Sequence, residues 1–334
     1  MPEKKTSNPA LVWVIFLLIS LLALAVAPWM GPQLPLHEIL NRDGGGGIGH
    51  TIFWKMRVPR VLLAYVAGAS LSLCGMCFQG MFRNALATPY TLGVSSGASL
   101  GVTIHIYLGG MFALPGFTSS STAAFLGAVA TILLVYGLTS FRGSVTPSVL
   151  LLAGVAVSFF FSSLILLFQY LCNFTELQQH MRWLMGGLET VGYREVRQLA
   201  FFCGISMLLI LWQVDALNLM ALGDEFAISR GVNVARVRKL FFFAVSLMVG
   251  SVVAFCGPIG FVGMVCPHIC RMIVGENHRR LAPASILFGG SFLVICDTFG
   301  RCLIAPVEIP TGIITALLGG PFFLWLLFSR RENI

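Results

Sequence analysis

Apolar segments of similar length, separated by short polar stretches, follow one another along almost the whole chain. A helix needs about 20 mostly apolar residues to cross the hydrocarbon core of a bilayer, and most of these segments reach about that length. The pattern therefore predicts an all-α polytopic membrane protein with about ten transmembrane helices. The predicted spans are residues 11–31, 58–82, 91–110, 118–139, 147–171, 196–213, 237–256, 259–274, 281–304 and 309–328. The segment 259–274 is short and contains Pro267, which favours a broken or partial span there.

The composition supports this class of protein. Hydrophobic residues make up 57% of the 334 residues, charged residues make up 10%, and the mean hydropathy is +0.88. A soluble domain of this size cannot bury so much apolar surface, whereas lipid can cover it. We therefore expect residues 1–334 to form a single transmembrane domain.

The basic residues predict the orientation of the chain. The net charge of +8 fits a cytoplasmic face rich in Lys and Arg better than a nucleic-acid partner. With the N-terminus inside, 13 of the 21 Lys and Arg residues fall on inner segments and 8 on outer ones. This distribution predicts that both termini are cytoplasmic. Residues 11–30 lack charge, exceed the length of a signal-peptide core and precede no A-x-A cleavage site, so we expect them to remain as a span.

The polar segment DALNLMALGDEFAISRGVNVARVRK, residues 215–239, interrupts the apolar pattern. Leu219, Leu222 and Phe226 fall at helical spacing, so a short helix here would carry a narrow apolar stripe. The expected ends of this helix are marked by Asp224 after Gly223 as N-cap, by Arg230 in the last turn and by Gly231 as the stop. Either a soluble partner packs against the stripe, or the segment lies on lipid or in solvent.

Several basic residues fall on predicted outer segments, against the usual bias. Arg57 and Arg60 lie at the outer mouth of the second span, and Arg301 ends the ninth. Arg301 follows Asp297 by one helical turn, so the two side chains can pair along one face. Outer positive charge indicates either an acidic partner or side chains that reach the lipid headgroups.

Some short motifs resemble catalytic or metal sites but favour other roles. Residues 44–51 fit a P-loop except that His50 replaces the essential Lys, so we interpret them as a flexible loop. The hydrolase-like string around Ser95 coincides with a ladder of Gly93, Gly97 and Gly101, which is typical of close helix packing in lipid. His105 is too far along the same helix to activate Ser95.

The nine cysteines lie mostly in apolar runs, where free thiols pack as small hydrophobic groups. Cys74 with Cys77, and Cys266 with His268 and Cys270, are single clusters without the second half that a structural metal site requires. We therefore expect no metal site and no disulfide framework.

Few titratable side chains occupy the predicted spans. Four spans have no ionisable residue in their cores, and the span 91–110 contains only His105. Carriers driven by ions or protons need such groups near the middle of the membrane. The shortage indicates that energy enters through another subunit, and the segment 215–239 is where a soluble subunit could bind.

Eight strings along the chain together resemble one family. They are RVPR (57–60), FRNALATPYTLGVSSGASLG (82–101), LLLAGVAVS (150–158), WLMGGL (183–188), LNLMALGDEFAISRGV (217–232), GPIGFVGMVCPHICR (257–271), DTFGR (297–301) and EIPTGIITALLGGPFFLWLL (308–327). In this order they closely resemble the permease subunits of type II ATP-binding-cassette (ABC) importers, the FecCD-type family that carries vitamin B12, haem and iron–siderophore complexes.

The resemblance implies a dimer of ten-helix permeases, identical or paralogous, in a bacterial or archaeal cytoplasmic membrane. Two cytoplasmic ATPase subunits would bind ATP and Mg, a periplasmic or lipid-tethered binding protein would deliver substrate, and this chain would bind no cofactor. The arginines that receive the binding protein correspond to Arg57, Arg60 and Arg301. The coupling helices correspond to about residues 216–231, with contacts from Leu219, Leu222, Gly223, Asp224, Phe226, Arg230 and Gly231.

The resemblance also implies an inner gate and a pathway. The gate corresponds to Asn84 and Leu86 after the second span and to Pro147 and Ser148 at the start of the fifth. This chain departs from the family where Ala85 replaces a frequent Pro, and where Pro147 replaces a small polar residue. Small groups that would suit the pathway lining are Gly154, Ser158, Gly312 and Thr315.

An iron chelate is the expected cargo, with a ferric siderophore favoured, because residues 87–101 resemble the iron-chelate permeases more than the vitamin B12 permeases. Vitamin B12 and haem remain alternatives. Two other classes also remain open: a secondary carrier, and an intramembrane serine hydrolase that uses Ser95 with His268 as its base.

Overall fold

The computed structural model describes residues 9–31, 47–85, 87–110, 119–141 and 146–329. Its regular structure is helical, apart from one isolated bridge between Ile304 and Val307. Each of the ten predicted spans contains a helix. These helices are α1 (Pro9–Val26), α4 (Val58–Phe82), α5 (Val94–Tyr107), α6 (Ser119–Phe141), α7 (Pro147–Leu171), α9 (Arg194–Trp212), α12 (Val234–Cys256), α13 (Val262–Val274), α14 (His278–Cys302) and α15 (Thr311–Ser329).

Seven helical stretches within the described residues are long and apolar enough to cross a membrane, and shorter apolar helices accompany them. The chain is therefore an integral, polytopic all-α protein. α13 is shorter than the spans around it, as predicted, but the helix continues through Pro267. The predicted break at this residue is wrong.

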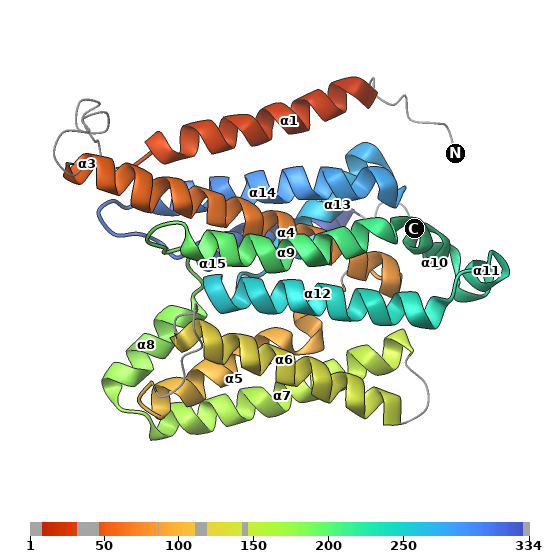
Figure 1. Cartoon of the computed structure of the whole chain (residues 1–334), viewed down its shortest axis with the longest axis horizontal. Helices are drawn as coiled ribbons and strands as arrows, with labels where there is room; N and C mark the ends of the chain where they lie inside the picture. Colours follow the sequence, from red (N-terminus) through yellow and green to blue (C-terminus); the bar gives the residue numbers. More distant parts are fainter. Residues whose placement is uncertain (1–8, 32–46, 86, 111–118, 142–145, 330–334) are drawn as a thin grey trace.

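The long helices lie side by side around α4 and α12 (Figure 1). α4 packs against α9, α12, α13 and α14. In the most apolar part of the continuous helical stretch Ile48–Phe82, 83% of the residues are buried, against 17% in α7. α5, α6 and α7 form one edge of the bundle, and α1 covers α14 at the opposite edge (Figure 1). The most exposed long helix is therefore α7, whereas α4 is the central support.

Glycines set the closest approaches between helices. A Cβ atom at Gly75 of α4 would lie 1.5 Å from the carbonyl oxygen of Gly263 on α13, so no larger residue fits there. On α5, Cβ atoms at Gly97 and Gly101 would collide with the backbone of α6. Gly97 and Gly101 of the predicted ladder therefore pack α5 against α6, and Gly93 approaches Gly154 of α7. These contacts support a packing role for the string around Ser95.

Three helical elements were not predicted as such. Residues Ile48–Thr51 form the short helix α3, and Ile52–Arg57 continue it as a π-helical turn (η2) into α4. The flexible-loop prediction is wrong for residues 48–51, and residues 44–46 lie outside the described part. Helix α8 (Phe174–Leu184) begins with a capping box between Asn173 and Glu176.

His180 attaches α8 to the bundle. The hydroxyl of Thr103 on α5 donates to the carbonyl of Ser99, so it accepts the hydrogen bond from Nε2 of His180 over 2.7 Å. Nδ1 of His180 then accepts from the amide of Gln169 on α7 over 2.8 Å. Burial lowers the pKa of His180 below its ordinary value, which favours this neutral form.

The two ends of the bundle carry different elements (Figure 1). α3 and α8 lie at one end, called here the α8 end. The short helices α10 (Val214–Leu222) and α11 (Asp224–Ser229) lie at the other, called the α11 end. α1 begins at the α11 end and α15 finishes there, as an even number of crossings requires.

Candidate functional site

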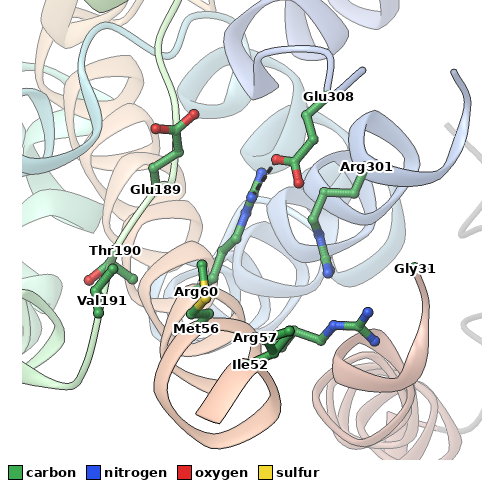
Figure 2. A pocket seen from close by; sticks show the side chains of 10 residues that line it. All are labelled: Gly31, Ile52, Met56, Arg57, Arg60, Glu189, Thr190, Val191, Arg301 and Glu308. Atoms are coloured by element: carbon green, nitrogen blue, oxygen red, sulfur yellow. Dashed lines mark hydrogen bonds and ion pairs between the residues drawn. The ribbon is translucent and has the colours of Figure 1, made fainter. Parts of the chain in front are cut away.

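Arg57 and Arg60, which are close in sequence, meet the distant Arg301 at the α8 end. Arg57 ends the π-helical turn, Arg60 is in the first turn of α4, and Arg301 is in the last turn of α14. They line a cavity of about 480 Å³, called here the arginine pocket (Figure 2). Its other lining residues are Gly31, Ile52, Met56, Glu189, Thr190, Val191 and Glu308.

The carboxylate of Asp297 organises the base of the arginine pocket. Only 1% of its side chain is exposed. It accepts from Nε and Nη2 of Arg60 at 2.9–3.1 Å, from Nε of Arg301 at 3.1 Å and from the hydroxyl of Thr311 at 3.0 Å. The predicted pairing of Asp297 with Arg301 is confirmed. Because a buried carboxylate needs several donors, this network ties α4, α14 and the start of α15 together.

The arginines differ in how they can meet a partner. The guanidinium of Arg301 is buried and donates through its remaining nitrogens to the carbonyls of Ala27 and Met30 and to Thr298. Nη1 of Arg60 donates to Glu308 over 2.6 Å, and half of the Glu308 side chain is exposed. Arg57 points toward Gly31 and donates to the carbonyl of Pro28 over 3.3 Å (Figure 2).

Acidic groups balance the arginine pocket. Glu189 and Glu308 line the pocket with the three arginines, and Asp297 lies at its base. The surface of the arginine pocket is therefore less positive than the arginines alone suggest. Of these acidic groups, sequence reasoning identified only Asp297, from its position one turn before Arg301. Glu308 lies 248 residues from Arg60, and no local pattern joins the two.

At the α11 end, the predicted single helix over residues 216–231 is two helices. Gly223, with φ 137°, breaks the segment after α10 and is the N-cap of α11. The prediction of Asp224 as N-cap is therefore wrong, because Asp224 lies inside α11 and its carboxylate bonds elsewhere. The predicted stop is confirmed: Gly231 has φ 83°, and its N–H donates to the carbonyl of Ile228.

The apolar stripe of this segment is exposed. Leu222 is 71% exposed and Phe226 is 40% exposed, whereas Leu219 is half-buried against the core. Ile228, which the sequence pattern did not single out, lies two residues after Phe226 on α11 and is 61% exposed. We call Leu222, Phe226 and Ile228 the α11 face. Arg230 lies over the ring of Phe226.

Ion pairs and hydrogen bonds tie α10 and α11 to three long helices. Asp224 pairs with Arg238 of α12 at 2.6 Å and reaches Arg83, just after α4, at 3.9 Å. Asp215 pairs with Arg279 of α14. The amide of Asn218 accepts from the backbone and ring of His278, each at 2.8 Å. These contacts join α10 and α11 to α12, to α14 and to the end of α4.

The predicted gate residues lie partly at the same end. The backbone of Asn84 is held by the carbonyl of Gln79 just after α4, and Leu86 lies outside the described residues. Pro147 is half-buried and Ser148 is exposed at the start of α7. The structure thus places the described gate positions at the helix ends nearest α10 and α11 (Figure 1).

The predicted pathway residues pack mainly within the subunit. A Cβ atom at Gly154 would lie 2.6 Å from Cα of Leu92, in the short 3-10 helix η3 (Pro89–Leu92), and the hydroxyl of Ser158 donates to the carbonyl of Gly154. Gly312 approaches the carbonyl of Met185, and Thr315 is buried. Their contribution to a pathway stays a prediction.

The cysteines, Ser95 and His268 were the other candidate chemical groups in the sequence. All nine cysteines are free thiols. Within the described residues, no group of three or more His, Cys, Asp or Glu side chains could hold a metal ion. Ser95 lies on α5 and His268 on α13, where the ring of His268 packs edge-on against Phe322.

Comparisons with known proteins agree in family. The model of the FecCD transport family matches residues 12–329. The hemin transport system permease of Yersinia pestis is 36% identical over 322 residues, covering 96% of this chain and 95% of that protein. The vitamin B12 import system permease of Klebsiella pneumoniae is also 36% identical, over 319 residues, covering 94% and 92%.

A solved structure shows the same architecture. A chain of a metal-chelate type ABC transporter in an inward-facing conformation has a TM-score of 0.84 and 30% identity, covering 96% of this chain and 99% of that one. The extent of these matches covers both the arginine pocket and the α11 face. The chain therefore belongs to the FecCD transport family, and the relatives named above are permeases of ABC importers.

Proposed function

We propose that this chain is the permease subunit of an ATP-driven importer that carries an iron chelate, most fittingly a ferric siderophore, across the cytoplasmic membrane. The observation that carries the proposal is the exposed α11 face, mounted on two short helices that are bonded to α4, α12 and α14. Family membership supports the transport role. The whole chain would act as one permease domain, and ATP with Mg would bind to partner subunits.

The α11 face supports a soluble ATPase as the partner. Leu222, Phe226 and Ile228 expose apolar surface beyond the ends of the long helices, where a soluble subunit can cover it. Glu225 and Arg230 lie within the same short segment and would form a polar rim. With this partner, the α11 end, where α1 begins and α15 finishes, would face the cytoplasm.

The opposite end supports a binding protein as the second partner. The α8 end, with the arginine pocket, would face the outside, and the pocket would offer Arg57 and one edge of Arg60 to acidic side chains. Rim charges of this kind act mainly on the rate of association. The docking role of Arg57 and Arg60 is thus retained, whereas Arg301 would support the pocket from below.

A second permease, identical or paralogous, would complete the pathway. α7 exposes large apolar side chains such as Leu152 and Phe159 along most of its length. Lipid alone could cover them, but a permease of this family would use such a helix to border a central path. The described gate positions Asn84, Pro147 and Ser148 would then close that path at the α11 end.

The cargo is proposed at the level of chemistry. The relatives compared above are named for haem, vitamin B12 and metal chelates, all large molecules built around a metal ion. A pathway bordered by small and apolar groups would let such a cargo pass without a fitted pocket. Residues 87–101, which form η3 and the start of α5, favour the iron chelates by resemblance.

Uptake into proteoliposomes tests the cargo. Vesicles containing the permease, its ATPase and its binding protein, with ATP on the ATPase side, should accumulate iron-55 supplied as a ferric siderophore. Labelled haem and labelled cobalamin serve as matched alternatives under the same conditions. Accumulation of cobalamin or haem without iron-55 from the siderophore would replace the proposed cargo while leaving the importer role intact.

A further inference from the structure

We propose that Glu308 is an internal stand-in for the binding protein: it occupies the outward edge of Arg60 in the resting permease and gives way to a carboxylate of that protein on docking. This inference rests on the docking role proposed above for the arginine pocket. It assigns a specific contact, Nη1 of Arg60, and a specific chemistry, a carboxylate exchange.

The two partners of Arg60 differ in exposure. Nε and Nη2 donate to Asp297, whose side chain is 1% exposed and is also held by Arg301 and Thr311. Nη1 donates to Glu308, whose side chain is 49% exposed. Asp297 is therefore a fixed partner that orients the guanidinium, and Glu308 is the partner that a second protein can reach.

The backbone around Glu308 allows its side chain to leave without moving the segment. The N–H of Val307 donates to the carbonyl of Ile304, and the N–H of Ile309 donates to the carbonyl of Gly300. Glu308 thus lies between two anchored residues, between the end of α14 and the start of α15. Rotation of its side chain alone would release Nη1 of Arg60.

The exchange would keep docking reversible. When an incoming carboxylate replaces Glu308, one charge-assisted hydrogen bond to Arg60 is lost and one of the same kind forms. The released Glu308 remains in water because it is already half exposed. The binding protein therefore gains orientation at this contact without becoming trapped, which suits a partner that must dissociate after each delivery.

The arginine pocket contains a natural control for charge alone. Glu189 lines the same cavity, and Figure 2 shows its carboxylate away from Arg60. Replacing Glu189 by Gln removes the same unit charge from the same pocket, but it does not remove the carboxylate that bonds to Arg60. A comparison of the two Gln variants therefore separates direct competition for Arg60 from the effect of the net charge of the pocket.

The test measures binding kinetics by surface plasmon resonance. The immobilised partner is the reconstituted permease–ATPase complex, and the probe is the binding protein that stimulates its ATP hydrolysis. We expect Glu308→Gln to raise the association rate about fivefold, and Glu189→Gln to raise it by less than about twofold and only at low salt. Equal effects of the two variants, or slower association with Glu308→Gln, would overturn the exchange.

A third variant separates this inference from the docking proposal. Arg57→Glu places a negative charge in the pocket and leaves the contacts of Arg60 and Glu308 in place, so it should slow association at low salt. Wild-type association with Arg57→Glu would refute docking at the arginine pocket. Slow association with Arg57→Glu, together with equal rates for the two Gln variants, would leave docking intact and refute only the exchange.

Discussion

Replacing Phe226 by Asp is expected to separate ATP hydrolysis from transport, and Leu222→Asp should do the same. Both side chains belong to the exposed α11 face, so the isolated permease should fold normally. In the assembled transporter, the aspartate would be buried without a partner at a subunit contact, which costs several kcal/mol. We expect the affinity of the ATPase for the permease to fall at least about 100-fold. Uptake should then be lost.

Phe226→Leu is the matched control, since it keeps an apolar side chain at the same position and should retain assembly. Co-purification of the ATPase and substrate-stimulated hydrolysis are the two readouts. Normal assembly and normal uptake by both aspartate variants would remove the α11 face from the coupling mechanism. The result would then favour a segment that lies on lipid or in solvent.

The second large effect is expected at Asp297. Asp297→Asn removes the charge that Arg60 and Arg301 share while keeping the size of the side chain. Loss of one member of a buried ionic network typically costs about 3–5 kcal/mol, because the remaining charges stay buried without compensation. Thermal unfolding of the detergent-solubilised permease should shift down by roughly 5–10 °C.

Glu308→Gln is the control for this experiment because it removes a carboxylate from the same arginine on its exposed side. An exposed ion pair contributes about 0–1 kcal/mol, so the thermal midpoint should move by no more than about 2 °C. If both variants unfold like the wild type, Asp297 does not hold the arginine pocket together.

Apolar length was enough to locate the spans. The predicted segments 58–82 and 147–171 coincide with α4 and α7, because Pro59 and Pro147 stand in their first turns and polar residues follow them. Composition alone also identified the class, since so much apolar surface requires lipid. Helix α8 was missed although its capping box, Asn173 with Glu176, is visible in the sequence.

The tertiary contacts of the site could not be deduced in the same way. The pairing of Asp297 with Arg301 follows from helical spacing, but the pairing of Arg60 with Glu308 requires α4 to pack beside the start of α15. Likewise, φ 137° at Gly223 splits one expected helix into two and frees Asp224 to bond Arg238. Local propensity does not encode either outcome.

The source of energy is the most direct test of an ATP-driven importer. Proteoliposomes containing the permease, ATPase and binding protein should accumulate the labelled iron chelate only with ATP on the ATPase side. Collapse of the proton gradient with an uncoupler should leave this uptake unchanged. Uptake that persists without ATP and disappears with the uncoupler would identify a secondary carrier and contradict the account.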